Sequence, residues 1–253
     1  MRLCVFCDGR LATSRSRARP RGALRTDFRT DFRAGFRAET YDRAMDDRGL
    51  FEVMRAVAAG DGASATGSLR SSPDLATATL SPAINRSAAD YFLEDCGLQL
   101  YSGDTLLHVA AAAYDTAFSK LLIEAGADVR ARNRRGAEPL HAATNGNPQS
   151  TRWNPRAQAE VIGYLIGAGA DPDALAAGGV TPLHRAVRNR CAAAVSALLD
   201  AGADPSRRND NGSSALDLAG RATGRGGSGS APAKAQQAEI VRLLTDALAA
   251  GGG

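Results

Sequence analysis

Apolar residues recur in the same order several times between residues 102 and 219, each time in two short runs divided by polar residues. In the copy at residues 178–210 the first run reads PLHRAV and the second reads AAVSALLDAG. Val195 and Leu198 in the second run are three residues apart, which places them on one face of a helix. Gly202 suits the left-handed position that ends such a helix. The pattern predicts pairs of helices joined by polar loops.

The spacing of two markers indicates that these copies form a regular repeat. The chain contains three histidines, and all of them stand in the first run: His108, His141 and His184. A second marker, AGAD, places a glycine after each second run: Gly126, Gly169 and Gly202. The histidines are 33 and then 43 residues apart, whereas the glycines are 43 and then 33 apart. The period is therefore 33 residues, and one unit carries ten extra residues between His141 and Gly169.

Residue types at the start of each unit explain why it folds as a helix pair. Thr181 can cap a helix N-terminus, and Pro182 fits the first helical position, where no backbone hydrogen bond is lost. Leu183 then points toward the core, and small residues such as Ala186 allow helices to approach closely. One helix–turn–helix–loop unit cannot bury its apolar face alone, so we expect the units to stack.

The three units resemble the ankyrin repeat. The motifs GDTLLH, GAEPLH and GVTPLH, followed by paired leucines and by AGAD, are similar to its T-P-L-H and G-A-D pattern. The resemblance is specific across residues 102–219 and extends more weakly over 48–248. It implies an all-α ankyrin-repeat solenoid of helix–turn–helix–loop units with degenerate terminal caps. Leu106 stands where the pattern has Pro, and Glu138 where it has Thr, so we expect local differences at those two helix starts.

The resemblance divides the chain into six segments. Residues 1–45 are predicted to be an Arg-rich disordered tail, with the alternative that translation begins at Met45. Residues 46–101 are predicted to form a degenerate N-terminal cap with a Gly/Ser/Thr-rich insertion; its first helix is GLFEVMRAVAAGD and a weak candidate for its second is INRSAADYFLEDCG. The repeats themselves occupy residues 102–134, 135–177 (with the ten extra residues) and 178–210. Residues 211–253 are predicted to form a C-terminal cap with a Gly/Ser-rich insertion before a second helix, QAEIVRLLTDAL.

The repeat accounts for the histidines without any chemistry. The resemblance implies that each bonds locally, around the Thr hydroxyl and the neighbouring loop backbone. The structural set is Thr105, His108, His141, Thr181, His184, Gly126, Gly169 and Gly202. A catalytic histidine needs a partner within about 3 Å, and stacking keeps the rings apart from one another.

The lone CxxC of Cys4 and Cys7 lacks a second ligand pair, and GRGGSGSAP lacks the phosphate-loop pattern. We therefore expect no catalytic residue, no metal, no cofactor and no small-molecule substrate.

Charge argues against nucleic acid as the main partner. The net charge is +4, but residues 1–43 carry 11 Arg against 5 Asp plus Glu, so the repeats are close to neutral. A nucleic-acid-binding fold should carry its basic excess on the folded part.

The longest apolar runs are far below the roughly 18 to 20 residues of a membrane span. Arg outnumbers Lys 29 to 2, which is typical of a GC-rich genome, so each arginine alone is weak support for function.

Partners of ankyrin stacks usually meet the concave face, which is built from loop tips and first-helix residues. Matching positions in the loops are Arg132, Arg134, Arg135, Ala137, Leu175, Ala177, Val180, Arg208, Asp210 and Asn211; those in the first helices are Asn145, Arg188 and Asn189. Five arginines against one aspartate suit an acidic protein partner, because guanidinium groups pair with carboxylates through two hydrogen bonds. The alternative is that these arginines only solvate the surface.

The ten extra residues contain Trp153, the only tryptophan of the chain. An exposed tryptophan on a loop is typical of an interface anchor. The alternative is that Trp153 folds back over the neighbouring helices.

The sequence as a whole predicts a non-catalytic, cytoplasmic module for protein–protein interaction. Three alternatives remain open. They are an inhibitor or immunity-type regulator of an enzyme encoded by a neighbouring gene, a secreted effector that binds host proteins, and nucleic-acid binding through the Arg-rich tail, which should be salt-sensitive. No oligomeric state is predicted.

Overall fold

The computed structural model of the chain describes residues 48–81, 92–221 and 230–250. The predictions for residues 1–45, including those for Cys4 and Cys7, lie outside these residues. None of the helices in the described stretches combines the length and the hydropathy that a membrane crossing requires.

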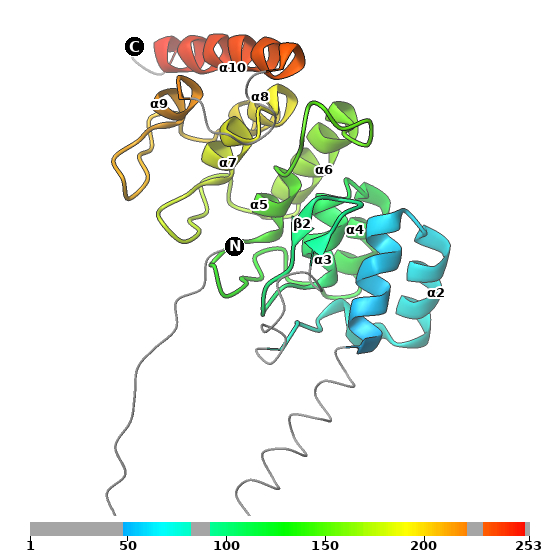
Figure 1. Ribbon diagram of the computed structural model, residues 1–253. Coiled ribbons are helices and arrows are strands. Elements are labelled where there is room, and N and C mark those ends of the chain that lie inside the picture. Colours follow the sequence, from blue (N-terminus) through cyan, green and yellow to red (C-terminus); the bar gives the residue numbers. More distant parts are fainter. Residues whose placement is uncertain (1–47, 82–91, 222–229, 251–253) are drawn as a thin grey trace, which may run out of the picture. The chain divides into compact units, whose positions relative to one another are not determined.

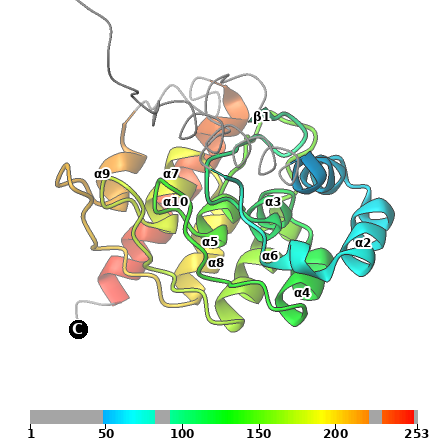
Figure 2. The same ribbon diagram turned by 90° about the horizontal axis from the view of Figure 1, so that it is seen from below.

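Four pairs of helices follow one another in the described residues from 102 onward (Figure 1). They are α3 (Leu106–Ala112) with α4 (Thr116–Glu124), α5 (Pro139–Ala143) with α6 (Pro155–Gly167), α7 (Pro182–Arg188) with α8 (Ala192–Asp200), and α9 (Ala215–Ala219) with α10 (Ala231–Ala250). First helices pack on first helices, from α3 through α9, and second helices pack on second helices, from α4 through α10. Figure 2 shows the same succession seen along another direction. The expected all-α repeat fold is confirmed.

The N-terminal cap differs from the prediction. Residues 48–59 are helical as expected, but the second helix is α2 (Gly62–Ser71), followed by the short 3-10 helix η1 (Pro73–Ala76). Our weak candidate at residues 84–97 is wrong in its described part, where β1 (Phe92–Leu93) and β2 (Leu98–Gln99) form an antiparallel hairpin.

Two local features explain why α2 forms in a stretch rich in Gly and Ser. Asp61 caps the helix by accepting a hydrogen bond from the Ser64 backbone N–H at 3.0 Å. Ala65 and Leu69, four residues apart, are both buried on one face. Capping and burial therefore outweigh the poor helix propensity of glycine here.

The second helix of the C-terminal cap also begins earlier than predicted. Helix α10 starts at Ala231, whereas the sequence predicted a helix from Gln237 and a flexible linker before it. Pro232 fits the first turn of a helix, and the Ser230 hydroxyl accepts a hydrogen bond from the Ala233 N–H at 3.3 Å. The residues 231–236 therefore extend the helix, while residues 222–229 lie outside the described part.

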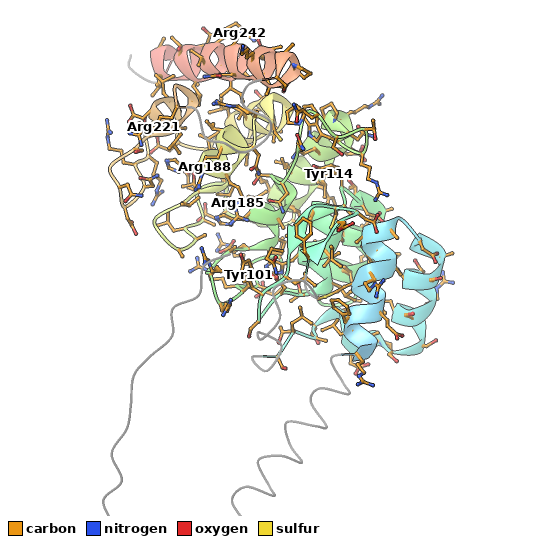
Figure 3. All side chains as sticks on the ribbon, in the orientation of Figure 1. Tyr101, Tyr114, Arg185, Arg188, Arg221 and Arg242 are labelled. Atoms are coloured by element: carbon orange, nitrogen blue, oxygen red, sulfur yellow. The ribbon has the colours of Figure 1, made fainter. Side chains whose placement is uncertain are left out.

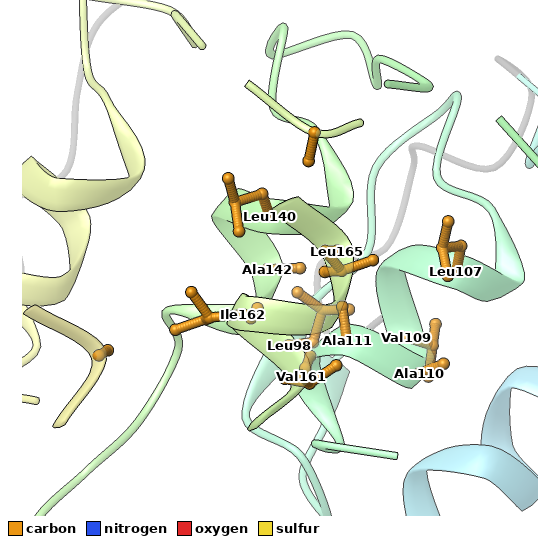
Figure 4. Close-up of a cluster of buried hydrophobic side chains, with 14 of the residues drawn as sticks. Leu98, Leu107, Val109, Ala110, Ala111, Leu140, Ala142, Val161, Ile162 and Leu165 are labelled. Carbon is orange, nitrogen blue, oxygen red and sulfur yellow. The ribbon is translucent and has the colours of Figure 1, made fainter. Parts of the chain in front are cut away.

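Leucines at equivalent positions form the core of the stack. In first helices they are Leu107, Leu140 and Leu183, and in second helices Leu122, Leu165 and Leu198; all are at most 1% exposed. Figure 4 shows how Leu140, Ile162 and Leu165 gather between neighbouring helices, with Ala142 beside them. Each buried leucine stabilises the fold by about 1.5–3 kcal/mol relative to exposure. Since helices of neighbouring units contact each other extensively, stacking stabilises the units.

Each histidine ring joins its own unit to the next one. The Nδ1 atoms of His108, His141 and His184 accept a hydrogen bond from the backbone N–H at the start of their own helix, at 3.2 Å in every case. The Nε2 atoms lie 3.0–3.1 Å from carbonyl oxygens of the following unit, which belong to Ala137, Val180 and Ser213. Because Nδ1 accepts, the neutral ring with its proton on Nε2 fits this arrangement.

The differences expected at Leu106 and Glu138 leave the backbone unchanged. Both helix starts keep the bond from the cap N–H to the histidine Nδ1, as Thr181 does in the third unit. The Glu138 carboxylate instead pairs with Arg132. In the last unit Asp217 replaces histidine and accepts a hydrogen bond from the Ser214 N–H at 2.9 Å.

Two long side chains connect units at a second point. Tyr114 and Arg190 occupy equivalent positions and are the non-glycine residues with positive φ in the described part, at 59° and 61°. The Tyr114 hydroxyl donates to the carbonyl oxygen of Asn145. Arg190 is fully buried, and its guanidinium donates to the carbonyl oxygens of Arg221 at 2.6 Å and Ala219 at 2.9 Å. Asn145 and Arg221 are again equivalent positions, so the same connection is made with two different side chains.

Units with insertions use a glutamine to bond the end of the first helix. Gln158 donates from Nε2 to the Ala143 carbonyl at 2.9 Å, and Gln237 donates to the equivalent Ala219 carbonyl at 2.7 Å. Both glutamines lie in the second helix, just after an insertion. These bonds satisfy carbonyl groups that have no partner within a short helix.

Acidification should weaken the fold through His141. Burial lowers the pKa of His141 to about 3, so the unfolded chain binds a proton below about pH 6.5 that the folded chain does not bind. The free energy of unfolding should therefore fall by about 1.4 kcal/mol per pH unit from this group as the pH decreases below about 6.5. Urea unfolding of the wild type and of His141→Gln should show a stability difference that shrinks by about 2 kcal/mol between about pH 6.5 and pH 5. A difference that does not depend on pH would contradict the buried neutral ring.

Removing the Arg190 side chain should destabilise the end of the stack. Arg190→Gly suits the positive φ, so the loss reports on the missing side chain: the Arg221 carbonyl loses its donor from Arg190, and the Ala219 carbonyl keeps only the bond from Gln237. We expect the free energy of unfolding to decrease by about 2–4 kcal/mol. The control is Arg207→Ala, at an exposed position of the next loop, which should change it by less than about 0.5 kcal/mol. If the two substitutions lower the unfolding temperature equally, the stabilising role assigned to the Arg190 hydrogen bonds is wrong.

Candidate functional site

The loops between units are held in fixed positions by hydrogen bonds. Within each loop an aspartate accepts from a backbone N–H two residues later: Asp128 from Arg130, Asp171 from Asp173 and Asp204 from Ser206, at 2.8–2.9 Å. Neighbouring loops are also bonded to each other, by the pairs Arg134–Ser102, Ala177–Arg135 and Asp210–Gly178 at 2.8–3.0 Å. Side chains carried by these loops therefore project from a backbone that is already ordered.

Two of the expected binding arginines surround an aromatic ring. The guanidinium carbons of Arg134 and Arg135 lie 5.3 and 5.6 Å from the centre of the Tyr101 ring. Cation–π contacts of this kind are worth about 0.5–1 kcal/mol at exposed sites. They limit the motion of both arginines while leaving the N–H groups of the guanidinium planes able to donate to a partner.

Helix α7 adds a third arginine to this group. Arg185 is half-buried, and its Nη1 donates to the His141 carbonyl oxygen at 3.3 Å. Burial lowers the pKa of Arg185 to about 10; the charges of Arg188 and Arg135 contribute to the decrease. Figure 3 shows Tyr101, Arg185 and Arg188 in succession along one side of the molecule. The group is a partly desolvated concentration of positive charge.

The outer arginines of the expected strip are already paired. The Arg132 Nε donates to the Glu138 carboxylate at 3.0 Å, and the Arg208 Nη1 to the Asp217 carboxylate at 3.2 Å. Burial raises the pKa of Glu138, while Arg132 lowers it. In the described part of the chain, by contrast, no carboxylate lies within ion-pair distance of Arg134, Arg135 or Arg185. The positive charge without an ion-pair partner therefore lies in the middle of the expected strip, on Arg134, Arg135 and Arg185.

The remaining expected residues make bonds within the molecule. Asn189 donates from Nδ2 to the Thr144 carbonyl at 3.0 Å, and the Asn145 carbonyl accepts from Gln158 at 2.8 Å. Trp153 is half-buried against the core, and its Nε1 donates to the Gln158 Oε1 at 2.9 Å. These contacts favour the view that Trp153 folds back over its neighbours.

The three histidine rings are engaged in structural bonds. Each histidine uses both ring nitrogens in the bonds between units described above. Over residues 48–81, 92–221 and 230–250 there is no group of three His, Cys, Asp or Glu side chains that could hold a metal ion. Burial raises the pKa of Cys191 to about 12, which keeps this thiol protonated and unreactive near neutral pH.

Sequence reasoning missed Tyr101 and Arg185. Arg185 stands between the motif residues His184 and Ala186, at the position that Val109 and Ala142 occupy in the earlier units, and its change from apolar to charged was a usable signal. Tyr101 precedes the first recognisable repeat, so no repeat position assigned it to the binding face.

Comparisons with known proteins match the two ends of the repeat region. A family model described as "Ankyrin repeats (many copies)" matches residues 165–219, and one described as "Ankyrin repeat" matches residues 102–134. Among curated proteins, "Ankyrin repeat and SOCS box protein 16" of Mus musculus is 38% identical over 117 residues, which are 46% of this chain and 25% of that protein.

Two further relatives match about half of this chain. "Tyrosine-protein kinase Shark" of Drosophila melanogaster is 33% identical over 141 residues, 53% of this chain and 14% of the kinase. "Neurogenic locus notch homolog protein 1" of Danio rerio is 34% identical over 119 residues, 47% of this chain and 4% of that protein. The chain thus covers a quarter or less of the length of these relatives.

The family matches, the stacked helix pairs and the 33-residue period all indicate the same repeat. Ankyrin repeats are generally non-catalytic modules for protein–protein interaction. With two family matches, named relatives and stacked helix pairs of the same period, the chain is an ankyrin repeat protein.

Proposed function

We propose that this chain binds a partner protein, without catalysing a reaction, on a surface that we call the arginine face: Tyr101, Arg134, Arg135, Arg185 and Arg188. We infer from the family resemblance that this surface corresponds to the concave face of ankyrin stacks. The observation that carries the proposal is the absence of any carboxylate, within the described residues, at ion-pair distance from Arg134, Arg135 and Arg185. Three like charges with no carboxylate at ion-pair distance among the described residues favour the binding of an anion.

An acidic segment of the partner suits this face best. Guanidinium groups donate two parallel hydrogen bonds to a carboxylate, and the bond is stronger where water is partly excluded. Arg185 is half-buried, so a carboxylate that reaches it enters a region of reduced solvent. The same carboxylate would relieve the repulsion between Arg185 and Arg188.

Order in the free protein supports binding further. Arg134 and Arg135 contact the Tyr101 ring, and their loop is bonded to the loops on both sides. Less side-chain entropy is then lost when a partner binds. Asn145, Trp153 and Asn189 make intramolecular bonds with their polar groups or carbonyls, so we expect them to contribute less to affinity than the arginines.

Charge reversal on this face should abolish binding of an acidic peptide. The variant carries Arg134→Glu, Arg135→Glu and Arg188→Glu, and the probe is a fluorescent peptide rich in Glu and Gly. The wild type should bind it with an affinity that falls as salt is added, and the variant should bind at least about tenfold more weakly because attraction becomes repulsion.

A matched control separates this surface from net charge. Arg55→Glu, Arg70→Glu and Arg156→Glu change the charge equally at three exposed positions of other helices. This control should bind the peptide nearly as the wild type does. If both triple variants lose binding to the same extent, the peptide senses only overall charge and the arginine face is not the site.

A further inference from the structure

A second concave site lies where the two segments that depart from the repeat meet. A cavity of about 330 Å³ is lined by residues 92 and 94–97 of the β1–β2 hairpin, by the turn between α3 and α4, and by residues of the inserted loop between 146 and 153. None of its lining residues belongs to the arginine face. The regular repeat does not provide this cavity, so it is an individual feature of this chain.

Three aromatic side chains line the cavity: Phe92, Tyr114 and Trp153. The Phe92 side chain is 46% exposed, which is unusual for a large apolar group in this structure. Figure 3 marks Tyr114 next to the hairpin.

Two of these rings are held in place by hydrogen bonds. The Tyr114 hydroxyl donates to the Asn145 carbonyl, and the Trp153 Nε1 donates to Gln158. Trp153 also rests on Gly146, where an added Cβ would lie 3.0 Å from the indole Nε1. The aromatic walls are therefore ordered before any ligand binds.

The charged groups of the cavity leave an excess of one negative charge. Asp95 forms an ion pair with Arg152, and both residues line the cavity. Glu94 is exposed at the same cavity, and no ion pair or hydrogen bond joins its carboxylate to another described residue. Burial raises the pKa of the Cys96 thiol to about 11, so this thiol is neutral near pH 7. Aromatic faces and a free carboxylate attract the same kind of group, a cation.

We propose that this cavity binds a lysine or arginine side chain of a partner protein. The aliphatic stem of such a side chain contacts the aromatic rings, and its charged end lies near Glu94. A neutral side chain would fill the same volume but would bring the Glu94 carboxylate out of water without compensation. The charge preference is opposite to that of the arginine face, so the two proposals can fail independently.

Fluorescence of the single tryptophan provides a direct test with the full chain. Trp153 is the only tryptophan, so its emission reports on this cavity alone. The probes are capped tripeptides Gly-Lys-Gly and Gly-Arg-Gly, with Gly-norleucine-Gly as the neutral analogue of similar length. We expect a saturable change in emission with the cationic peptides, and binding of the norleucine peptide about tenfold more weakly.

Matched variants assign the effect to the carboxylate. Glu94→Gln should weaken binding of the lysine peptide about fivefold or more, with an unchanged unfolding temperature because the side chain is exposed. Glu160→Gln removes the same charge from an exposed position of α6 outside the cavity and should bind as the wild type does. Equal binding of the norleucine peptide, full binding by Glu94→Gln, or no saturable change would each overturn the proposal. The triple variant of the arginine face should keep this binding, which separates the two surfaces.

Discussion

The structure depends on one constraint: a single helix pair cannot bury its own apolar face or complete the hydrogen bonds of its histidine. First helices of five or seven residues are too short to be stable alone, and they pack on the first helices of neighbouring units. The histidine ring adds a polar requirement to this apolar one, because its Nε2 needs a carbonyl oxygen from the following unit. Both requirements are met only in register, so every unit fixes the position of its neighbour.

The same requirement orders the surface used for recognition. The loop that carries Arg134 and Arg135 is bonded to the loops before and after it, and Arg185 reaches back to a carbonyl of the preceding first helix. Charges from two segments, the loop with Arg134 and Arg135 and helix α7 with Arg185, are thus collected near Tyr101 although they are far apart in sequence. The ankyrin framework supplies the rigidity, and the side chains at a few variable positions supply the chemistry of binding.

The sequence was sufficient where structure follows from the repeat. The period, the helix pairs of residues 102–219 and the left-handed glycines at the ends of second helices could all be predicted, because each depends on a local motif; the φ values of Gly126, Gly169 and Gly202 are 97°, 106° and 87°. Prediction failed where contacts outside the repeat decide the outcome. Helix α2 is stabilised by one cap and two buried side chains in a Gly-rich stretch, and Tyr101 became part of the arginine face only through contacts with Arg134 and Arg135. The cavity needed the hairpin and the inserted loop together, which no single segment could reveal.

The histidine bonds also give the stack a direction. Each ring donates forward, toward the unit that follows it in the chain, and none donates backward. Asp217, in the position of the histidine, has no proton to offer forward and instead closes a reciprocal cap with Ser214. Loss of the last unit would therefore leave the Nε2–H group of His184 without its acceptor, the Ser213 carbonyl. Loss of the first unit would leave both hydrogen bonds of every remaining histidine ring in place. The two ends of the repeat array are therefore chemically unequal. Removing a unit from the beginning breaks no hydrogen bond of the remaining histidines, whereas removing one from the end does.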